Sequence, residues 1–203
     1  AGSRPAQRRL YRRLPWGNAA VCRGGLLRGA VVQVFLIRHT RPQLAAGICY
    51  GQLDVACEDP LPVARQLRVQ IPCDTPIFCS PLKRARVLAE ALGKPCGVTP
   101  CIDARLSEIS FGNWEGKPWE DIDRAALDMW AADVLHFVPP GGESVAQLRA
   151  RVIAFAETLR LPRVAIVAHA GVMKTLCGYW QKLPSEDWTQ LEFSFGGLVE
   201  LTV

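Results

Sequence analysis

The sequence predicts an α/β fold, a single three-layer domain in which a mainly parallel sheet is flanked by helices. Two segments, 31–37 and 163–168, are apolar apart from Gln33 and Arg163 and are rich in β-branched residues. Such runs are typical of strands that are buried on both faces of a sheet. Between them, residues 143–159 repeat apolar side chains at helical spacing, which predicts an amphipathic helix.

Two proline-containing pairs predict where helices begin. Ser80-Pro81 is typical of an N-cap followed by a proline in the first turn, so we expect a helix from there to Leu92, stopped by Gly93. Asp59-Pro60 predicts an earlier helix over 61–69.

The remaining elements complete an alternation of strands and helices. We expect a strand over 76–79, a helix over 171–180 and a final strand over 198–203. Residues 106–116 show neither the helical nor the strand period, and we expect them to form a structured loop.

The charge is divided unevenly along the 203 residues. Residues 1–30 hold seven arginines and no acidic residue, whereas residues 31–203 carry a net charge of −2. We expect 1–30 to be a basic extension outside the domain of 31–203; a transit peptide, a cloning remnant and a misassigned start would all look like this. The body has no basic stripe with interleaved aromatic residues, so nucleic acid is not an expected partner.

The sequence also argues against a membrane or metal protein. No apolar run approaches the roughly 18 residues that span a bilayer. The eight cysteines form no C-x-x-C pair and have no histidine at zinc-finger spacing, so we expect no metal site. We expect their thiols to be reduced, as in a cytoplasmic protein.

The candidate functional residues lie where predicted strands end. His39 and His169 follow the strands over 31–38 and 163–168, and ligands of open α/β sheets bind at the carboxyl ends of strands. Arg38 precedes His39, and Arg84 falls in the first turn of the helix after the strand over 76–79. A cation is unfavourable in both places unless it meets an anion.

Two guanidinium groups and two imidazoles are suited to a phosphate site. Arginine offers forked donors to phosphoryl oxygens, and nearby positive charge keeps a histidine neutral and nucleophilic. A phosphohistidine route also needs an acid to protonate the leaving group. Glu108, in the predicted loop, is the first candidate and Glu115 the alternative.

Five ordered segments resemble the histidine phosphatase superfamily, whose fold is phosphoglycerate-mutase-like. They are Leu36-Ile37-Arg38-His39-Thr40, Ser80-Pro81-Leu82-Lys83-Arg84-Ala85, residues 106–116, Pro140-Gly141-Gly142-Glu143-Ser144, and Val167-Ala168-His169-Ala170-Gly171-Val172. The resemblance implies that His39 is the phosphorylated nucleophile and that Arg38, Arg84 and His169 bind the phosphoryl oxygens. It implies that Glu108 is the proton donor, and that neither a metal nor another cofactor is required.

A finer resemblance concerns the substrate, which we expect to be a small phosphomonoester. The family's common pattern has Gly, Ser or Thr, and Asn where this chain has Thr40, Pro42 and Ala45. Residues 38–42 and 47–55 instead resemble the α-ribazole phosphatase branch, which removes the 5′-phosphate of α-ribazole phosphate during cobalamin biosynthesis. A broad-specificity phosphatase or a phosphoglycerate mutase remains an alternative, as does a non-catalytic polyanion-binding module that uses the basic extension.

Several other side chains have two possible roles. Tyr50 and Trp114 are candidates for stacking on a benzimidazole base, although aromatic residues beside catalytic loops often anchor the loop instead. We expect Trp119 and Trp130 to serve packing, and His136 to be a loop residue. The sequence predicts no oligomeric state.

Overall fold

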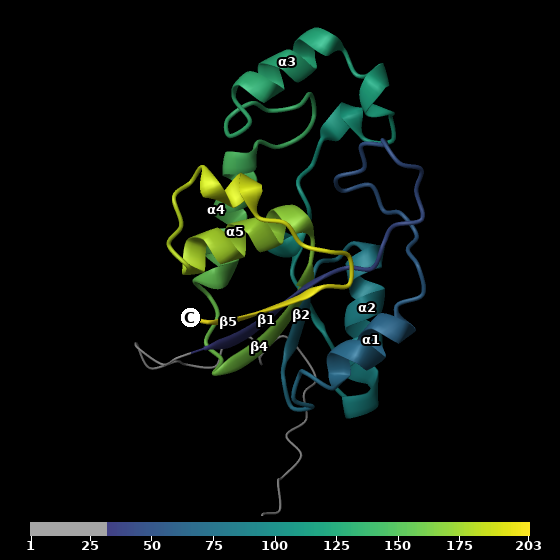
Figure 1. Cartoon of the computed structure of the whole chain (residues 1–203), viewed down its shortest axis with the longest axis vertical. Coiled ribbons are helices and arrows are strands. Elements are labelled where there is room, and N and C mark those ends of the chain that lie inside the picture. Colours follow the sequence, from purple (N-terminus) through teal and green to yellow (C-terminus); the bar gives the residue numbers. More distant parts are fainter. Residues whose placement is uncertain (1–31) are drawn as a thin grey trace, which may run out of the picture.

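The computed structural model describes residues 32–203 (Figure 1). The basic extension over 1–30, and the first residue of the strand expected over 31–37, lie outside the described residues.

One five-stranded sheet organises the chain, in the order β3-β2-β4-β1-β5. The strands are β1 (Gln33–Arg38), β2 (Ile77–Cys79), β3 (Cys101–Ile102), β4 (Arg163–Ala168) and β5 (Leu198–Thr202). The pairs β1–β4, β2–β4 and β2–β3 are parallel, and β5 pairs antiparallel with β1. The sheet is therefore mixed and mainly parallel, which confirms the predicted fold class.

Helices cover both faces of this sheet, as Figure 1 shows. α1 (Leu61–Arg68) and α2 (Lys83–Gly93) lie on one face, and α4 (Val145–Ala156) and α5 (Ala170–Trp180) lie on the other. α3 (Arg124–Ala132) lies apart from the sheet, at the top of the view.

Alternation along β1 divides the core between the two faces. Phe35 and Ile37 pack with α1 and α2, whereas Val34 and Leu36 pack with α4 and α5. Each is at most 1% exposed, and full burial of such a side chain stabilises the fold by about 1.5–3 kcal/mol. Burial on both faces is the reason that the strand is continuously apolar.

The predicted limits of α2 were wrong at both ends. The N-cap is Leu82, and the Ser80 hydroxyl accepts the Leu82 N–H at 3.2 Å, so Ser80 caps the turn before the helix. Gly93 lies inside the helix, where a Cβ would collide with the carbonyl of Val98. A 3₁₀ turn over Lys94–Cys96 follows and ends at Gly97, which has a φ of +66°.

The other predicted elements are close to their expected places. α4 begins at Val145 because Ser144 and Gln147 form a reciprocal capping box, and its buried face includes Leu148 and Val152 as expected. The segment 106–116 is a loop with only a single 3₁₀ turn over Gly112–Trp114 and the end of another at Leu106. The two-residue strand β3 was not predicted, because it is too short to show a period.

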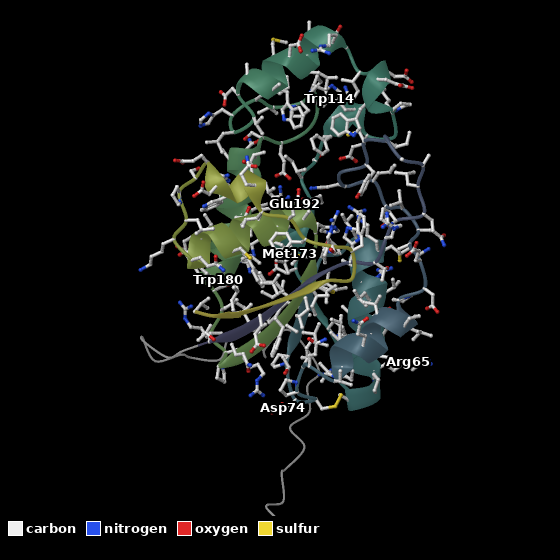
Figure 2. The ribbon with its side chains drawn as sticks, in the orientation of Figure 1. Arg65, Asp74, Trp114, Met173, Trp180 and Glu192 are labelled. Carbon is white, nitrogen blue, oxygen red and sulfur yellow. A yellow bond between two sulfur atoms is a disulfide. The ribbon has the colours of Figure 1, made fainter. Side chains whose placement is uncertain are left out.

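One pair of cysteines contradicts the expectation of reduced thiols. Cys73 and Cys96 form a disulfide between the segment after α1 and the turn after α2, with Cα atoms 5.4 Å apart (Figure 2). The two residues are 23 apart in sequence, and the packing of α1 on α2 brings them together. Their spacing resembles no short cysteine motif, so the sequence alone did not indicate the pair.

Within residues 32–203, no helix combines the length and the apolar character that crossing a bilayer requires.

We expect Cys73→Ser to lower the free energy of unfolding by roughly 3 kcal/mol under non-reducing conditions, because the crosslink restricts the unfolded chain over its 23-residue separation. Urea unfolding with and without reductant measures this. Cys57→Ser, at a half-buried thiol outside the disulfide, is the control and should leave the reductant effect intact. If reductant changes neither the wild type nor Cys73→Ser, the crosslink is not formed.

Candidate active site

Two histidines meet at the carboxyl edge of the sheet. His39 follows β1 and His169 follows β4 as the N-cap of α5, and their ring centroids lie 4.9 Å apart. The contact follows from the topology, because β1 and β4 are adjacent parallel strands with Arg38 paired to Ala168. Both rings are at most 1% exposed.

The hydrogen bond of His39 assigns the tautomer of its ring. Nδ1 lies 2.7 Å from the Thr40 carbonyl oxygen, which can only accept, so Nδ1 carries the proton and Nε2 carries the lone pair. Burial lowers the pKa of His39 to about 3; the Thr40 hydrogen bond opposes this, and Arg84 and Arg38 add to the lowering. His39 is therefore neutral at pH 7, as a nucleophile must be.

Arg84 is the most deeply placed cation of the site. Its side chain is fully buried, and Nη1 and Nη2 donate to the carbonyls of Leu53 at 2.8 Å and Gly51 at 2.6 Å. Gly51 has a positive φ, and a Cβ there would collide with the Glu115 carboxylate. Burial lowers the pKa of Arg84, and Glu108 and then Tyr50 act in the opposite direction.

Three buried donors in this region have no hydrogen-bond partner. They are Arg38 Nε, Arg84 Nε and His169 Nδ1, and they account for three of the five such side-chain atoms among residues 32–203. Unsatisfied buried polar atoms are rare in proteins and call for an explanation. Nitrogen donors without a partner are suited to bind an anion such as a phosphoryl group.

Ser80 fixes the orientation of His169 and was not singled out from the sequence as a site residue. Its Oγ lies 2.7 Å from His169 Nε2 and also accepts the Leu82 N–H. The hydroxyl hydrogen can point at Nε2, and in that arrangement His169 carries its proton on Nδ1. Burial lowers the pKa of His169 well below its usual value, and His39 and Arg84 add to this. A serine at the end of β2, beside the histidines that end β1 and β4, was the available signal.

Glu108 lies across the start of α5. Its Oε1 accepts the Ile109 N–H at 3.0 Å and its Oε2 accepts the Gly171 N–H at 3.2 Å. A Cβ on Gly171 would collide with the carboxylate, so the close approach requires glycine. The carboxyl group is held at a fixed place beside the helix that His169 caps.

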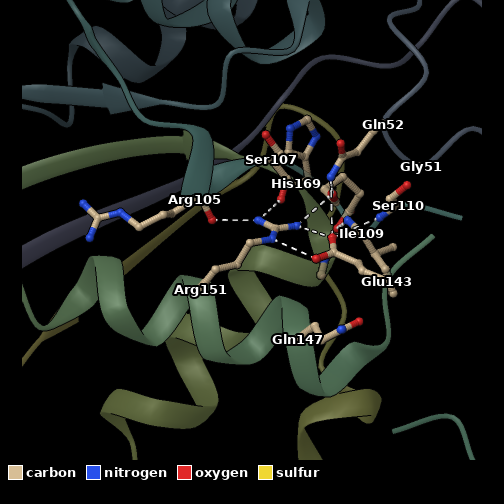
Figure 3. Close-up of polar contacts among 12 residues, drawn as sticks. Gly51, Gln52, Arg105, Ser107, Ile109, Ser110, Glu143, Gln147, Arg151 and His169 are labelled. Carbon is tan, nitrogen blue, oxygen red and sulfur yellow. Dashed lines mark hydrogen bonds and ion pairs between the residues drawn. The ribbon is translucent and has the colours of Figure 1, made fainter. Parts of the chain in front are cut away.

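An ion pair from α4 supports the loop that carries Glu108 (Figure 3). Arg151 donates to the carbonyls of Arg105, Ser107 and Glu108, and it pairs with Glu143 at 2.5 Å. Glu143 in turn accepts the Ser110 N–H. Gln52 donates to the Glu108 carbonyl at 2.8 Å, which ties the same loop to the segment that holds Arg84. This network was not predicted from the sequence, because its members lie on segments far apart in the chain.

Glu115, the alternative acid, is engaged elsewhere. Its Oε1 accepts the backbone N–H groups of Gln52 at 2.8 Å and Phe111 at 2.9 Å. The Glu115 carboxylate therefore joins the loop over 47–55 to the loop over 106–116. Glu108 lies at the start of the helix that His169 caps, so it is better placed than Glu115 to act as an acid beside the two histidines.

The aromatic candidates separate in the structure. The Tyr50 ring lies 5.1 Å from Arg84 Cζ and is half-buried, beside the phosphate-binding groups. Trp114 is 5% exposed and stacks on Phe137 below α3, so its ring serves packing (Figure 2). Trp119 and Trp130 stack on each other at 5.8 Å, which confirms the expected packing role.

His136 lies among the exposed residues after α3 and pairs with Asp133 at 3.1 Å. This confirms it as a loop residue.

A cavity of about 250 Å³ lies beside the loop that carries Glu108, and its lining includes none of Arg38, His39, Arg84, Glu108 and His169. Ile109 and Gly171, whose N–H groups hold the Glu108 carboxylate, both line it. The other lining residues come from the start of α4, from α5 and from the segments around α3 and 188–189, and most are apolar or aromatic: Phe111, Trp130, Val134, Val145, Leu148, Arg149, Lys174, Thr175, Trp188 and Thr189.

The family model that matches this chain is the histidine phosphatase superfamily (branch 1), over residues 34–203. The chain belongs to this superfamily. It is 29% identical over 180 residues to glucosyl-3-phosphoglycerate phosphatase of Mycolicibacterium vanbaalenii, covering 79% of each chain. It is 29% identical over 116 residues to adenosylcobalamin/alpha-ribazole phosphatase of Salmonella typhimurium, covering 54% of this chain and 57% of that one. The native structure of a mycobacterial glucosyl-3-phosphoglycerate phosphatase matches with a TM-score of 0.72 and 27% identity, covering 85% of this chain and 90% of that one. The resemblance inferred from the five segments is confirmed at the level of the superfamily.

The buried neutral state of His39 should make stability depend on pH. The unfolded imidazole takes up a proton near pH 6.5 and the folded one near pH 3, so lowering the pH between these values favours unfolding. Relative to His39→Gln, we expect the wild type to lose about 2 kcal/mol more between pH 7 and pH 5, measured by urea unfolding. His136→Gln, at an exposed ring, should follow the wild type, and parallel curves for the wild type and His39→Gln would show that His39 is not held neutral.

Proposed function

We propose that this superfamily phosphatase hydrolyses phosphomonoesters through a phosphohistidine at His39. The carrying observation is the set of unpartnered buried donors on Arg38, Arg84 and His169 beside the lone pair of His39 Nε2. Donors fixed in a water-poor site stabilise the charge that develops on transferring phosphoryl oxygens, and each typically lowers the barrier by about 3 kcal/mol.

The first step forms the phosphoenzyme. His39 Nε2 attacks phosphorus in line, the N–P bond forms, and the ester P–O bond breaks. Glu108 enters this step as the carboxylic acid and gives its proton to the departing oxygen. Arg38, Arg84 and His169 donate to the three phosphoryl oxygens.

The second step returns the enzyme to its starting state. The Glu108 carboxylate takes a proton from water, the water oxygen attacks phosphorus, and the N–P bond breaks. Inorganic phosphate leaves, Nε2 recovers its lone pair, and Glu108 is again the acid.

For the substrate we propose α-ribazole-5′-phosphate. The segments 38–42 and 47–55 support this, as does the similarity to the Salmonella phosphatase. The apolar, aromatic-lined cavity beside Glu108 also favours a leaving group that carries a flat apolar ring such as benzimidazole. The segment 47–55 also has a role that does not depend on the substrate. The carbonyls of Gly51 and Leu53 hold Arg84, and a phosphatase for any phosphomonoester would need Arg84 held in this way.

A phosphorylated sugar acid is the second candidate. The Mycolicibacterium glucosyl-3-phosphoglycerate phosphatase matches over 79% of this chain, a longer alignment than that of the Salmonella protein. Arg149 and Lys174 line the cavity and are the cations that a carboxylate there would need.

A substrate panel distinguishes the two. We expect kcat/KM for α-ribazole-5′-phosphate to exceed that for glucosyl-3-phosphoglycerate, phosphoserine and simple sugar phosphates by at least about tenfold. A preference for glucosyl-3-phosphoglycerate that is lost in Lys174→Met would establish the phosphorylated sugar acid as the substrate. Equal values across the panel would establish a broad-specificity enzyme.

His39→Ala should abolish turnover and the acid-labile phosphoenzyme seen after acid quenching with labelled substrate, because the lone pair that captures phosphorus is gone. His136→Ala is the matched control and should keep both. Turnover of His39→Ala above about 1% of the wild-type rate would refute His39 as the nucleophile, because removal of a covalent catalyst lowers the rate by far more than about 100-fold.

Glu108→Gln should slow hydrolysis of alkyl phosphates far more than that of p-nitrophenyl phosphate, whose leaving group needs little protonation. For alkyl esters we expect a loss of about 100-fold or more. Glu115→Gln is the control, and its loss should be the same for both substrates because it acts through loop structure. If the two variants exchange these patterns, Glu115 is the acid.

A further inference from the structure

Phe195 lies in the segment between α5 and β5 and contacts both residues at the end of β1. The Arg38 guanidinium carbon lies 3.7 Å from the centroid of the Phe195 ring, which is the distance of a stacked cation–π contact. The His39 ring centroid lies 5.5 Å from the same centroid, with the two planes tilted by 51°. A single aromatic ring therefore contacts both the nucleophile and one of its phosphate-binding neighbours.

The backbone directly after Phe195 is hydrogen-bonded to the end of β1 and to His39. The Gly196 N–H donates to the carbonyls of Arg38 and His39, both at 3.1 Å, and the Arg38 N–H donates to the Gly197 carbonyl at 3.0 Å. Gly196 has a φ of +67° and packs closely on Val63, so glycine is favoured there. The ring is thus held over the site by the main chain and by its own contacts.

Arg38 is restrained on two sides by this segment. Its Nη1 donates to the Phe193 carbonyl at 2.6 Å, and one face of its guanidinium lies on Phe195. Because the guanidinium is planar, these two restraints fix the direction of its remaining edge. That edge includes the buried Nε, which has no partner.

We propose that Phe195 is a positioning residue, which aims the Nε edge of Arg38 at the phosphoryl group and keeps water away from His39. The proposal rests on the proposed function of the site. Arg41 Cζ also lies 5.0 Å from the centroid of this ring, so the ring attracts two cations that repel each other.

The electrostatics of His39 agree with the second part of this role. Burial is the largest cause of its lowered pKa, and Phe195 is one of the groups that bury it. The charged and titratable groups around the ring are Arg38 from β1, Arg84 from α2 and His169 from the start of α5, with the Thr40 carbonyl on Nδ1. Removal of the Phe195 ring leaves Arg84, His169 and the Thr40 carbonyl in place and admits water.

Phe193 provides a matched comparison two residues away. Its side chain packs with the apolar core of α4 and α5, whereas Phe195 belongs to none of the apolar clusters among residues 32–203. Substitution of Phe193 therefore tests the contribution of an aromatic ring to stability, and substitution of Phe195 tests its contribution to the site.

The experiment compares Phe195→Leu, Phe195→Tyr and Phe193→Leu in the full chain. For Phe195→Leu we expect kcat to fall about tenfold with little loss of thermal stability, and the affinity for inorganic phosphate, measured by calorimetry, to weaken several-fold. The acid limb of its kcat/KM–pH profile should move up toward pH 6.5 as His39 becomes easier to protonate. Phe195→Tyr keeps the ring and should restore kcat to within about twofold of the wild type. Phe193→Leu should lower the melting temperature and leave the pH profile unchanged.

The outcomes separate this proposal from the proposed function. If His39→Ala is inactive and Phe195→Leu keeps the wild-type kcat, phosphate affinity and pH profile, the phosphohistidine route stands and the positioning role is refuted. If Phe195→Leu loses only stability, as Phe193→Leu does, the positioning role is also refuted. If His39→Ala remains active, the proposed function itself fails.

Discussion

The structure depends on a buried guanidinium group that, among residues 32–203, forms no direct ion pair with a carboxylate. Arg84 is fully buried, and its Nη groups donate to the main-chain carbonyls of Gly51 and Leu53. Carbonyl dipoles satisfy hydrogen bonds but carry no net charge, so the positive charge is compensated only by carboxylates that do not touch it, Glu108 foremost. The fold holds this charge because β2, α2 and the loop over 47–55 surround it, and on the proposed function an anionic substrate would add the missing negative charge.

Glu108, the proposed proton donor, is held by a different set of elements from those that hold the proposed phosphate-binding groups. The Glu108 loop is tied to α4 through Arg151, to α5 through the Gly171 N–H, and to the Arg84 segment through Gln52. Glu108 therefore has a fixed position relative to the helix that His169 caps. On the proposed mechanism, the same elements position both the phosphoryl group and the oxygen that leaves it. Positioning of this kind accounts for much of the rate that enzymes gain from bringing groups together.

Much of this arrangement could be predicted from the sequence, because buried parallel strands appear there as apolar runs. The apolar runs before His39 and His169 marked two strand ends, and the sheet then brought the rings to 4.9 Å. Contacts that depend on tertiary packing left no such pattern. The hydrogen bond of Ser80 to His169 spans 89 residues, and that of Arg38 to Phe193 spans 155. The Cys73–Cys96 disulfide likewise left no pattern in the sequence. Trp114 could not be assigned, because a tryptophan that stacks on a substrate and one that anchors a loop look the same in a sequence.

The unpartnered donors on Arg38, Arg84 and His169 have a consequence for the end of the catalytic cycle. Orthophosphate presents the same oxygens as the group that is transferred, so the features that favour its formation also retain it. Product departure then competes with chemistry for control of the overall rate. On the proposed mechanism, the enzyme would slow as inorganic phosphate accumulates, and its rate would depend on the phosphate concentration around it.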